Sequence, residues 1–249
     1  MNELYEALLA SKKYRDVCPD TIRRILDECA VKYKKPKDIE KAAREKLHGV
    51  TSAFMTESEY KRAMKLAGEA ALEPLLQCHA STRERLPLER LNADFDRILA
   101  VTGTPESILD LACGMNPIFL KHRLPDARVL GVDISGQSIA VIRAACDAEA
   151  VLGDLLCENS IPADRFDLAL LFKILPLLDR QQAGAADRVL AAVNARFIVI
   201  SFPTRTLGGR NVGMAENYGR WMQAHLPSNR NIAHSFETDN ELFYILKEN

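Results

Sequence analysis

The sequence predicts an α/β fold, in which helices cover a mainly parallel sheet, preceded by an all-helical region. From residue 107 onward, apolar runs rich in Ile, Leu and Val alternate with helical segments. Near-continuous apolar runs are typical of parallel strands buried on both faces. Before residue 90, apolar residues recur at helical spacing, as Leu4, Leu8 and Leu9 do, and no strand is evident.

These patterns divide the chain into two expected domains. We expect a helical domain over residues 1–95 and an α/β domain over residues 96–249, without an internal repeat or a long linker. The expected strands are Ile108–Leu111, Arg128–Asp133, Ala150–Gly153, Phe166–Phe172, Phe197–Phe202 and Leu242–Lys247.

Composition favours a globular cytoplasmic protein without a metal. Hydrophobic residues make up 47% and charged residues 27% of the 249 residues. No apolar run approaches a membrane span, and the first residues lack the basic and apolar segments of a signal peptide. The six cysteines are scattered without a CxxC pair, which favours reduced thiols over disulfides or a zinc site.

The first two expected strands end in residues that fit a nucleoside. Gly114 follows the first strand, where the lack of a Cβ lets the backbone approach a ligand. Asp133 closes the second strand, and its carboxylate could accept hydrogen bonds from both ribose hydroxyls. Each also has a structural explanation: Gly114 could simply be the glycine that the turn requires, and Asp133 could be the N-cap of the following helix. Their spacing favours the nucleoside and points to S-adenosylmethionine.

Two further acids extend this pattern. Asp110, within the first strand, could order the loop or hold the amine of the methionine moiety. Asp154 follows the third strand, where methyltransferases commonly place an acid facing the adenine amino group, and the next residue, Leu155, would pack on the ring. A surface-loop acid is the alternative for Asp154. The ordered set of acids and glycine favours a methyltransferase.

The segments that follow the expected strands argue against several other enzyme classes. The turn Ala112–Pro117 has one glycine, so it fits the pyrophosphate of NAD poorly. The Asn/Asp-Pro-Pro-Tyr/Phe motif of adenine amino-methylating enzymes is absent after the fourth strand. The nucleophilic cysteine that cytosine C5 methylation needs is absent after the fourth and fifth strands. What remains are targets that are already nucleophilic, such as guanine N7, which need alignment and electrostatics but no general base.

Several segments in one order carry a specific resemblance. They are Ala10–Arg15, Lys46–His48, His79–Arg85, Leu109–Pro117, Phe172–Pro176 and Ser201–Arg210. Together they closely resemble the aminoglycoside-resistance 16S rRNA guanine-N7 methyltransferases, over nearly the whole chain. The resemblance implies a class I S-adenosylmethionine-dependent methyltransferase fold (Rossmann-like). It also implies a cytoplasmic enzyme that methylates N7 of a decoding-site guanine in helix 44 of the assembled 30S subunit, releases S-adenosylhomocysteine and confers resistance to 4,6-disubstituted deoxystreptamines.

The resemblance also implies a cofactor pocket. Arg85 would pair with the methionine carboxylate, for which a guanidinium fork is well shaped. Phe172 fills a place that is often aliphatic in the family. The expected cofactor residues are Phe54, His79, Ala80, Ser81, Arg85, Asp110, Ala112, Gly114, Asp133, Asp154, Leu155, Phe172 and Gln181.

The target side involves cations. Lys173, Arg205 and Arg210 lie at or after the ends of the fourth and fifth strands, where they could contact a flipped guanine or a phosphate. Residues 1–90 carry 18 Lys+Arg against 15 Asp+Glu, which is compatible with rRNA docking and with a solvated surface. The expected docking cations are Lys12, Lys13, Arg15, Arg23, Arg24, Lys32, Lys34, Lys35 and Lys37.

Three alternatives stay open. A small-molecule methyltransferase would have a lid lined by apolar residues. A non-catalytic RNA-binding protein on this scaffold would have lost the cofactor residues, whereas Arg85, Gly114, Asp133 and Asp154 are present. A sister family modifies adenine N1 with a similar core. No sequence feature demands a dimer, so we expect a monomer.

Overall fold

Seven strands form one sheet in the computed structural model, which describes residues 1–51, 54–69, 71–204 and 214–249. The strands are β1 (Ser107–Leu111), β2 (Arg128–Asp133), β3 (Glu149–Leu152), β4 (Phe166–Phe172), β5 (Ala195–Pro203), β6 (Arg230–Glu237) and β7 (Glu241–Glu248). Their order is β3-β2-β1-β4-β5-β7-β6. Strands β1 to β5 are parallel, whereas β7 runs antiparallel to both β5 and β6. The mainly parallel sheet predicted from the sequence is confirmed.

The sequence patterns identified every strand except β6. Among the described residues, this edge strand pairs with β7 alone, and five of its eight side chains are exposed. A solvated edge strand needs no apolar run, which is why hydrophobic patterning did not reveal it.

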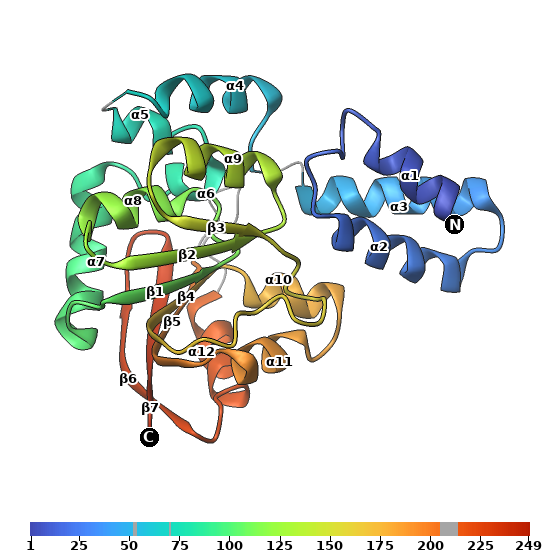
Figure 1. Cartoon of the computed structure of the whole chain (residues 1–249). Coiled ribbons are helices and arrows are strands. Elements are labelled where there is room, and N and C mark those ends of the chain that lie inside the picture. The colour runs from blue at the N-terminus through green and yellow to red at the C-terminus, as the bar shows by residue number, and fades with distance from the viewer. Residues whose placement is uncertain (52–53, 70, 205–213) are drawn as a thin grey trace.

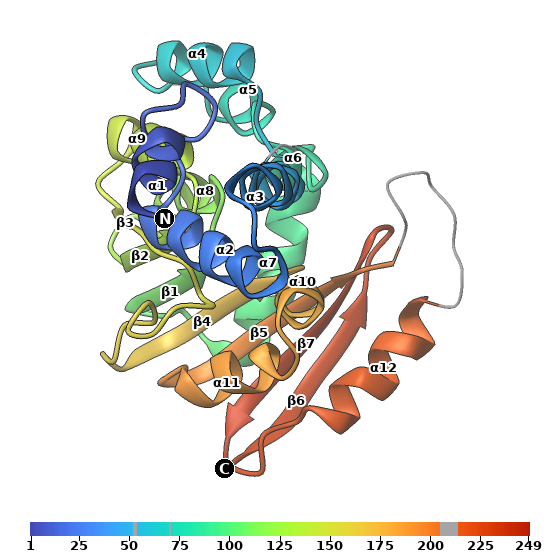
Figure 2. The same cartoon turned by 90° about the vertical axis from the view of Figure 1, so that its right-hand side faces the viewer.

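Helices surround the sheet, most of them on its two faces and the rest beside it. They are α1 (Asn2–Leu9), α2 (Pro19–Lys32), α3 (Pro36–Thr51), α4 (Glu57–Leu66), α5 (Leu72–Leu76), α6 (Ala80–Arg83), α7 (Leu88–Thr102), α8 (Asn116–Arg123), α9 (Gly136–Ala145), α10 (Leu175–Gln181), α11 (Ala185–Ala192) and α12 (Met214–Ala224). Helices α4, α5 and α7 to α9 contribute to the core on one face, and α10 to α12 to the core on the other (Figures 1 and 2).

Helices α1 to α3 form a unit with its own core. Leu8, Ile22, Leu26 and Leu47 meet in this core, and the unit stands beside the sheet domain (Figure 1). The apolar residues of α4, α5 and α7 instead join the core of the sheet. The packed cores therefore divide at about residues 51–54, inside the region expected from sequence to be one helical domain. We call α1–α3 the N-terminal helical unit.

Backbone pairing attaches this unit to the sheet domain. The N–H of Cys18 donates to the carbonyl of Ile134 at 2.8 Å, and the N–H of Gly136 donates to the carbonyl of Asp16 at 2.6 Å. Val17 and Ser135 form an antiparallel bridge between these two bonds. The unit is thus held at the segment that directly follows β2.

Within the described ranges, no helix is long and apolar enough to cross a membrane, and no cluster of His, Cys, Asp or Glu could hold a metal ion. All six cysteines are free thiols.

Candidate active site

The carboxyl ends of β1, β2 and β4 form the candidate site. The chain leaves β1 toward β2 on one side and returns as β4 on the other, and such a reversal is where open α/β sheets bind ligands. Ala112 after β1 and Lys173 after β4 both have a φ of 57°, in the left-handed region that non-glycine residues rarely adopt. Such strained residues concentrate at functional sites.

Gly114 lets two parts of the site approach each other. Its φ is 54°, and a Cβ there would lie 2.6 Å from Cε1 of His79. The His79 ring is buried and also stacks on Phe54, with centroids 5.8 Å apart, so it has little room to move. A glycine is therefore required for the β1 turn to pack against His79.

His79 is held as a neutral ring. Burial, with further contributions from Arg85 and Lys173, lowers the pKa of His79 to about 4. Its Nδ1 lies 3.0 Å from the hydroxyl of Ser81, and the N–H of Ala80 donates to the carbonyl of Phe54. The structure thus brings Phe54, His79, Ala80 and Ser81 together beside the β1 turn.

Asp133 is oriented by backbone amides on both of its oxygens. The N–H of Gly114 donates to Oδ2 and the N–H of Ser135 donates to Oδ1, each at 2.8 Å. Burial raises the pKa of Asp133, and these hydrogen bonds oppose that rise. Each oxygen retains an acceptor position, which suits the two hydroxyls of a ribose.

Asp110 is buried more deeply and holds Asn116. The side chain of Asp110 accepts a hydrogen bond from Nδ2 of Asn116 at 2.7 Å. Burial raises the pKa of Asp110 to about 7, against the effects of Asn116 and Arg85. The Oδ1 atom of Asn116 is buried without a hydrogen-bond partner among the described residues. An unpaired buried acceptor is costly in a folded protein, so this atom is available for a donor from a ligand.

Asp154 marks the third part of the site. It is buried two residues after β3, and its Oδ1 accepts a hydrogen bond from the N–H of Leu156 at 2.9 Å. Leu155 beside it is also buried. Its Oδ2 accepts two hydrogen bonds from Arg24 of α2, and Arg24 also reaches Gln181 at the end of α10. Sequence reasoning assigned Arg24 to rRNA docking and did not foresee this contact.

Glu241 binds two cations of the site, Arg85 and Lys173. Its Oε1 and Oε2 accept hydrogen bonds from Nε and Nη2 of Arg85 at 2.8 and 3.2 Å, and Oε2 also accepts from Ser201 at 2.7 Å. Lys173 pairs with both Glu241 and Glu84. Burial raises the pKa of Glu241, but Arg85 and Lys173 outweigh it and hold that pKa below its usual value.

Arg85 also packs against an aromatic ring. Its guanidinium carbon lies 4.5 Å from the ring centroid of Phe172, which makes edge contacts with Phe95 and Phe243. Glu241 takes two of the five guanidinium N–H groups, so Arg85 keeps donors for a carboxylate. Glu241 gave no signal in the sequence, because it is a lone acid at the start of a strand far along the chain from Arg85.

The remaining predicted residues lie elsewhere. Arg205 and Arg210 fall outside the described residues. The docking cations, Arg24 apart, have exposed side chains on the N-terminal helical unit: Lys12, Lys13, Arg15, Arg23, Lys32, Lys34, Lys35 and Lys37.

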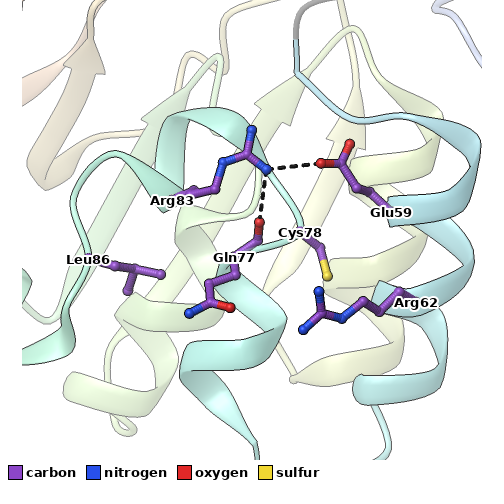
Figure 3. A pocket seen from close by; sticks show the side chains of 6 residues that line it. All are labelled: Glu59, Arg62, Gln77, Cys78, Arg83 and Leu86. Carbon is purple, nitrogen blue, oxygen red and sulfur yellow. Dashed lines mark hydrogen bonds and ion pairs between the residues drawn. The ribbon is translucent and has the colours of Figure 1, made fainter.

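A separate hollow of about 320 Å³ opens between α4, α5 and α6 (Figure 3). Arg83 lies across it and donates to Glu59 at 2.9 Å and to the carbonyl of Gln77 at 3.2 Å. None of the predicted cofactor residues lines it.

The donors and acceptors at the strand ends fit S-adenosylmethionine. Asp133 has an acceptor free on each oxygen, Asn116 has an unpaired oxygen, and Arg85 keeps free donors. Together they match a ribose diol, an ammonium and a carboxylate, which are three of the polar groups of that molecule. We propose that Asp133 holds the ribose, Asp154 the adenine amine, Asp110 with Asn116 the methionine amine, and Arg85 the methionine carboxylate.

Comparison with known proteins decides the family. The model of a family described as ribosomal RNA methyltransferase (FmrO) matches residues 10–245. The chain belongs to this family. It is 41% identical to a protein of Serratia marcescens named 16S rRNA (guanine(1405)-N(7))-methyltransferase, over 100% of this chain and 99% of that one. A protein of the same name from Frankia casuarinae is 31% identical, over 99% of this chain and 93% of that one.

Solved structures agree with this assignment to the FmrO family. The 16S rRNA methylase RmtB superposes with a TM-score of 0.89 at 39% identity, covering 100% of this chain and 98% of that one. The 16S rRNA methyltransferase RmtF, in complex with S-adenosylhomocysteine, gives a TM-score of 0.88 at 41% identity, with the same coverage. This member of the FmrO family is a class I methyltransferase whose cofactor is S-adenosylmethionine. The family resemblance drawn from its motifs is confirmed.

Proposed function

We propose that this enzyme methylates N7 of guanine 1405 of 16S rRNA, in helix 44 of the assembled 30S subunit. The observation that carries the proposal is the match along the whole chain to relatives named for that nucleotide and atom. The methyl and the positive charge that N7 gains would weaken binding of 4,6-disubstituted deoxystreptamines, which are themselves cations. Resistance to those drugs follows from the proposal.

Methylation of N7 mainly requires that the base and the methyl group of the cofactor are aligned. Guanine N7 carries a lone pair and no proton, so its methylation needs no general base. S-adenosylmethionine supplies a methyl group on a sulfonium. During the reaction the positive charge moves from the sulfonium of the cofactor to the methylated base. The neutral ring of His79 adds no further positive charge to the site. Lys173, directly after β4, is our candidate for contact with the flipped base. Glu84 and Glu241 already neutralise its charge, so we assign it no phosphate.

The direct test uses ribosomal subunits. Purified 30S subunits are incubated with the enzyme and labelled S-adenosylmethionine, and the nucleotide is mapped by reverse transcription after borohydride–aniline cleavage. We expect cleavage at guanine 1405, and no labelling of 30S subunits already methylated there by a relative. Label without cleavage at that guanine would favour another position, such as adenine N1. No label in 30S, with intact cofactor binding, would favour a small-molecule substrate.

A further inference from the structure

Arg24 points into the molecule, unlike Arg23 beside it. Only 14% of its side chain is exposed, although it lies on α2 of the N-terminal helical unit. Its Nε and Nη2 donate to Oδ2 of Asp154 at 3.1 and 2.9 Å, and Nη2 also donates to Gln181 at 3.2 Å. Its Nη1 donates to Glu28 at 2.8 Å. With two carboxylates neutralising its charge, Arg24 is poorly placed to bind a phosphate.

The hydrogen bonds of Asp154 leave one acceptor position open. A carboxylate has about four lone-pair positions. Arg24 fills both positions on Oδ2, and the N–H of Leu156 fills one position on Oδ1. Only 4% of the Asp154 side chain is exposed, so solvent contributes little to its orientation. Arg24 therefore holds the carboxylate of Asp154 in one orientation, in which a single acceptor position on Oδ1 remains free.

We propose that Arg24 is a positioning residue for the cofactor: it holds Asp154 and Gln181 from the N-terminal helical unit, so that Oδ1 of Asp154 accepts from the exocyclic amine of adenine. The inference rests on the assignment of Asp154 to adenine made above. It moves Arg24 from the rRNA-docking residues to the cofactor pocket.

The same unit meets the pocket at a second point. Residues 16–18 pair with residues 134–136, which directly follow the proposed ribose residue Asp133. The N-terminal helical unit thus touches the segments that carry both nucleoside acids. Any contact that shifts this unit would change cofactor affinity, and cofactor binding would in turn favour one placement of the unit, since such coupling is reciprocal.

The test compares two ligands by calorimetry on the free enzyme. S-adenosylhomocysteine carries the exocyclic amine, and S-inosylhomocysteine carries a carbonyl in its place. We expect Arg24→Ala to weaken binding of the adenosyl ligand roughly tenfold or more, because Asp154 loses its fixed orientation. Binding of the inosyl ligand should change little, so the preference for the amine shrinks. Arg24→Lys should lie between Arg24→Ala and the wild type.

Arg23→Ala is the matched control on the same helix. Arg23 is exposed, and its guanidinium carbon lies 3.7 Å from the ring centroid of Tyr5. This variant should keep the wild-type affinity for both ligands. If Arg24→Ala fails to fold, Arg24→Gln takes its place in the comparison.

Two outcomes would overturn the inference. One is wild-type affinity of the Arg24→Ala protein for S-adenosylhomocysteine. The other is an equal loss for both ligands, which would make Arg24 a structural link without a role in reading adenine. Because no ribosome is present in these measurements, a failure to methylate guanine 1405 would leave the result for Arg24 standing.

Discussion

At the residue scale, burial favours the neutral forms of His79 and Asp110. His79 is a buried base whose pKa falls to about 4, and Asp110 is a buried acid whose pKa rises to about 7. Both shifts favour the neutral form, because a low-dielectric surrounding penalises charge. Asp110 therefore ionises close to neutral pH, where a positively charged ligand amine would stabilise its carboxylate.

The Asp110→Asn substitution should change how stability depends on pH. The raised pKa means that the folded state holds a proton that the unfolded state has lost between about pH 4 and 7, so wild-type stability falls as pH rises. Removing the acid removes that loss. The free energy of unfolding of the variant, relative to wild type, should increase by roughly 2–3 kcal/mol between pH 5 and pH 8.

Urea denaturation followed by the single tryptophan, Trp221, measures this difference. His79 is present in both proteins, so its own titration largely cancels. The exposed Asp126→Asn is a control that removes the same charge, and its difference from wild type should stay flat. A flat difference for Asp110→Asn as well would contradict the shifted pKa.

Sequence identified the acids of this site but not their partners. Asp110, Asp133 and Asp154 are recognisable because each lies in or just after an apolar strand, and parallel strands end at one edge. Arg24 and Glu241 lie 130 and 156 residues from the side chains they hold. The sequence around Arg24 or around Glu241 contains no local pattern that predicts these contacts.

At the element scale, β7 does more than complete the sheet. It runs antiparallel between β5 and β6, and it begins with Glu241 beside Ser201 of β5. Both oxygens of Glu241 accept hydrogen bonds from Arg85, which follows α6. This strand was predictable from its apolar run, whereas its role in the site depends on a register that only the folded sheet defines.

Glu241→Ala should destabilise the protein by about 3–5 kcal/mol, because Arg85 would become a buried cation without its counter-charge. Thermal or urea unfolding measures the loss. Glu84→Ala is the matched control, since Glu84 is 41% exposed and its pair with Lys173 should contribute at most about 1 kcal/mol. Equal losses in the two variants would contradict this account of the network.

At the scale of the whole molecule, the N-terminal helical unit carries exposed cations that make no contact with the described residues of the candidate site. The exposed cations gather at the two ends of α2, a helix of 14 residues and therefore about 20 Å long. Lys12, Lys13 and Arg15 precede the helix, and Lys32, Lys34 and Lys35 lie at its other end. We propose that these two groups contact phosphates on the 30S subunit.

Reversing Lys32 and Lys35 to Glu should weaken 30S binding at least tenfold at low salt. The slope of log affinity against log salt should also fall by about 2, because each of the two lysines would neutralise one phosphate in the wild-type complex. Affinity for S-adenosylhomocysteine should not change, as neither residue contacts the site. Lys247→Glu on β7 is the control for added negative charge. An unchanged salt slope in the double variant would count against docking through this end of α2.

The site joins residues that lie far apart in the sequence, and this separation affects the order in which parts of the protein can form during synthesis. The core of α1 to α3 is complete once the first 51 residues are made, so this unit can fold early on the emerging chain. Arg24 must then wait for Asp154, and Arg85 for Glu241. A nascent chain would therefore expose the cations of the N-terminal helical unit well before it completed the proposed cofactor pocket.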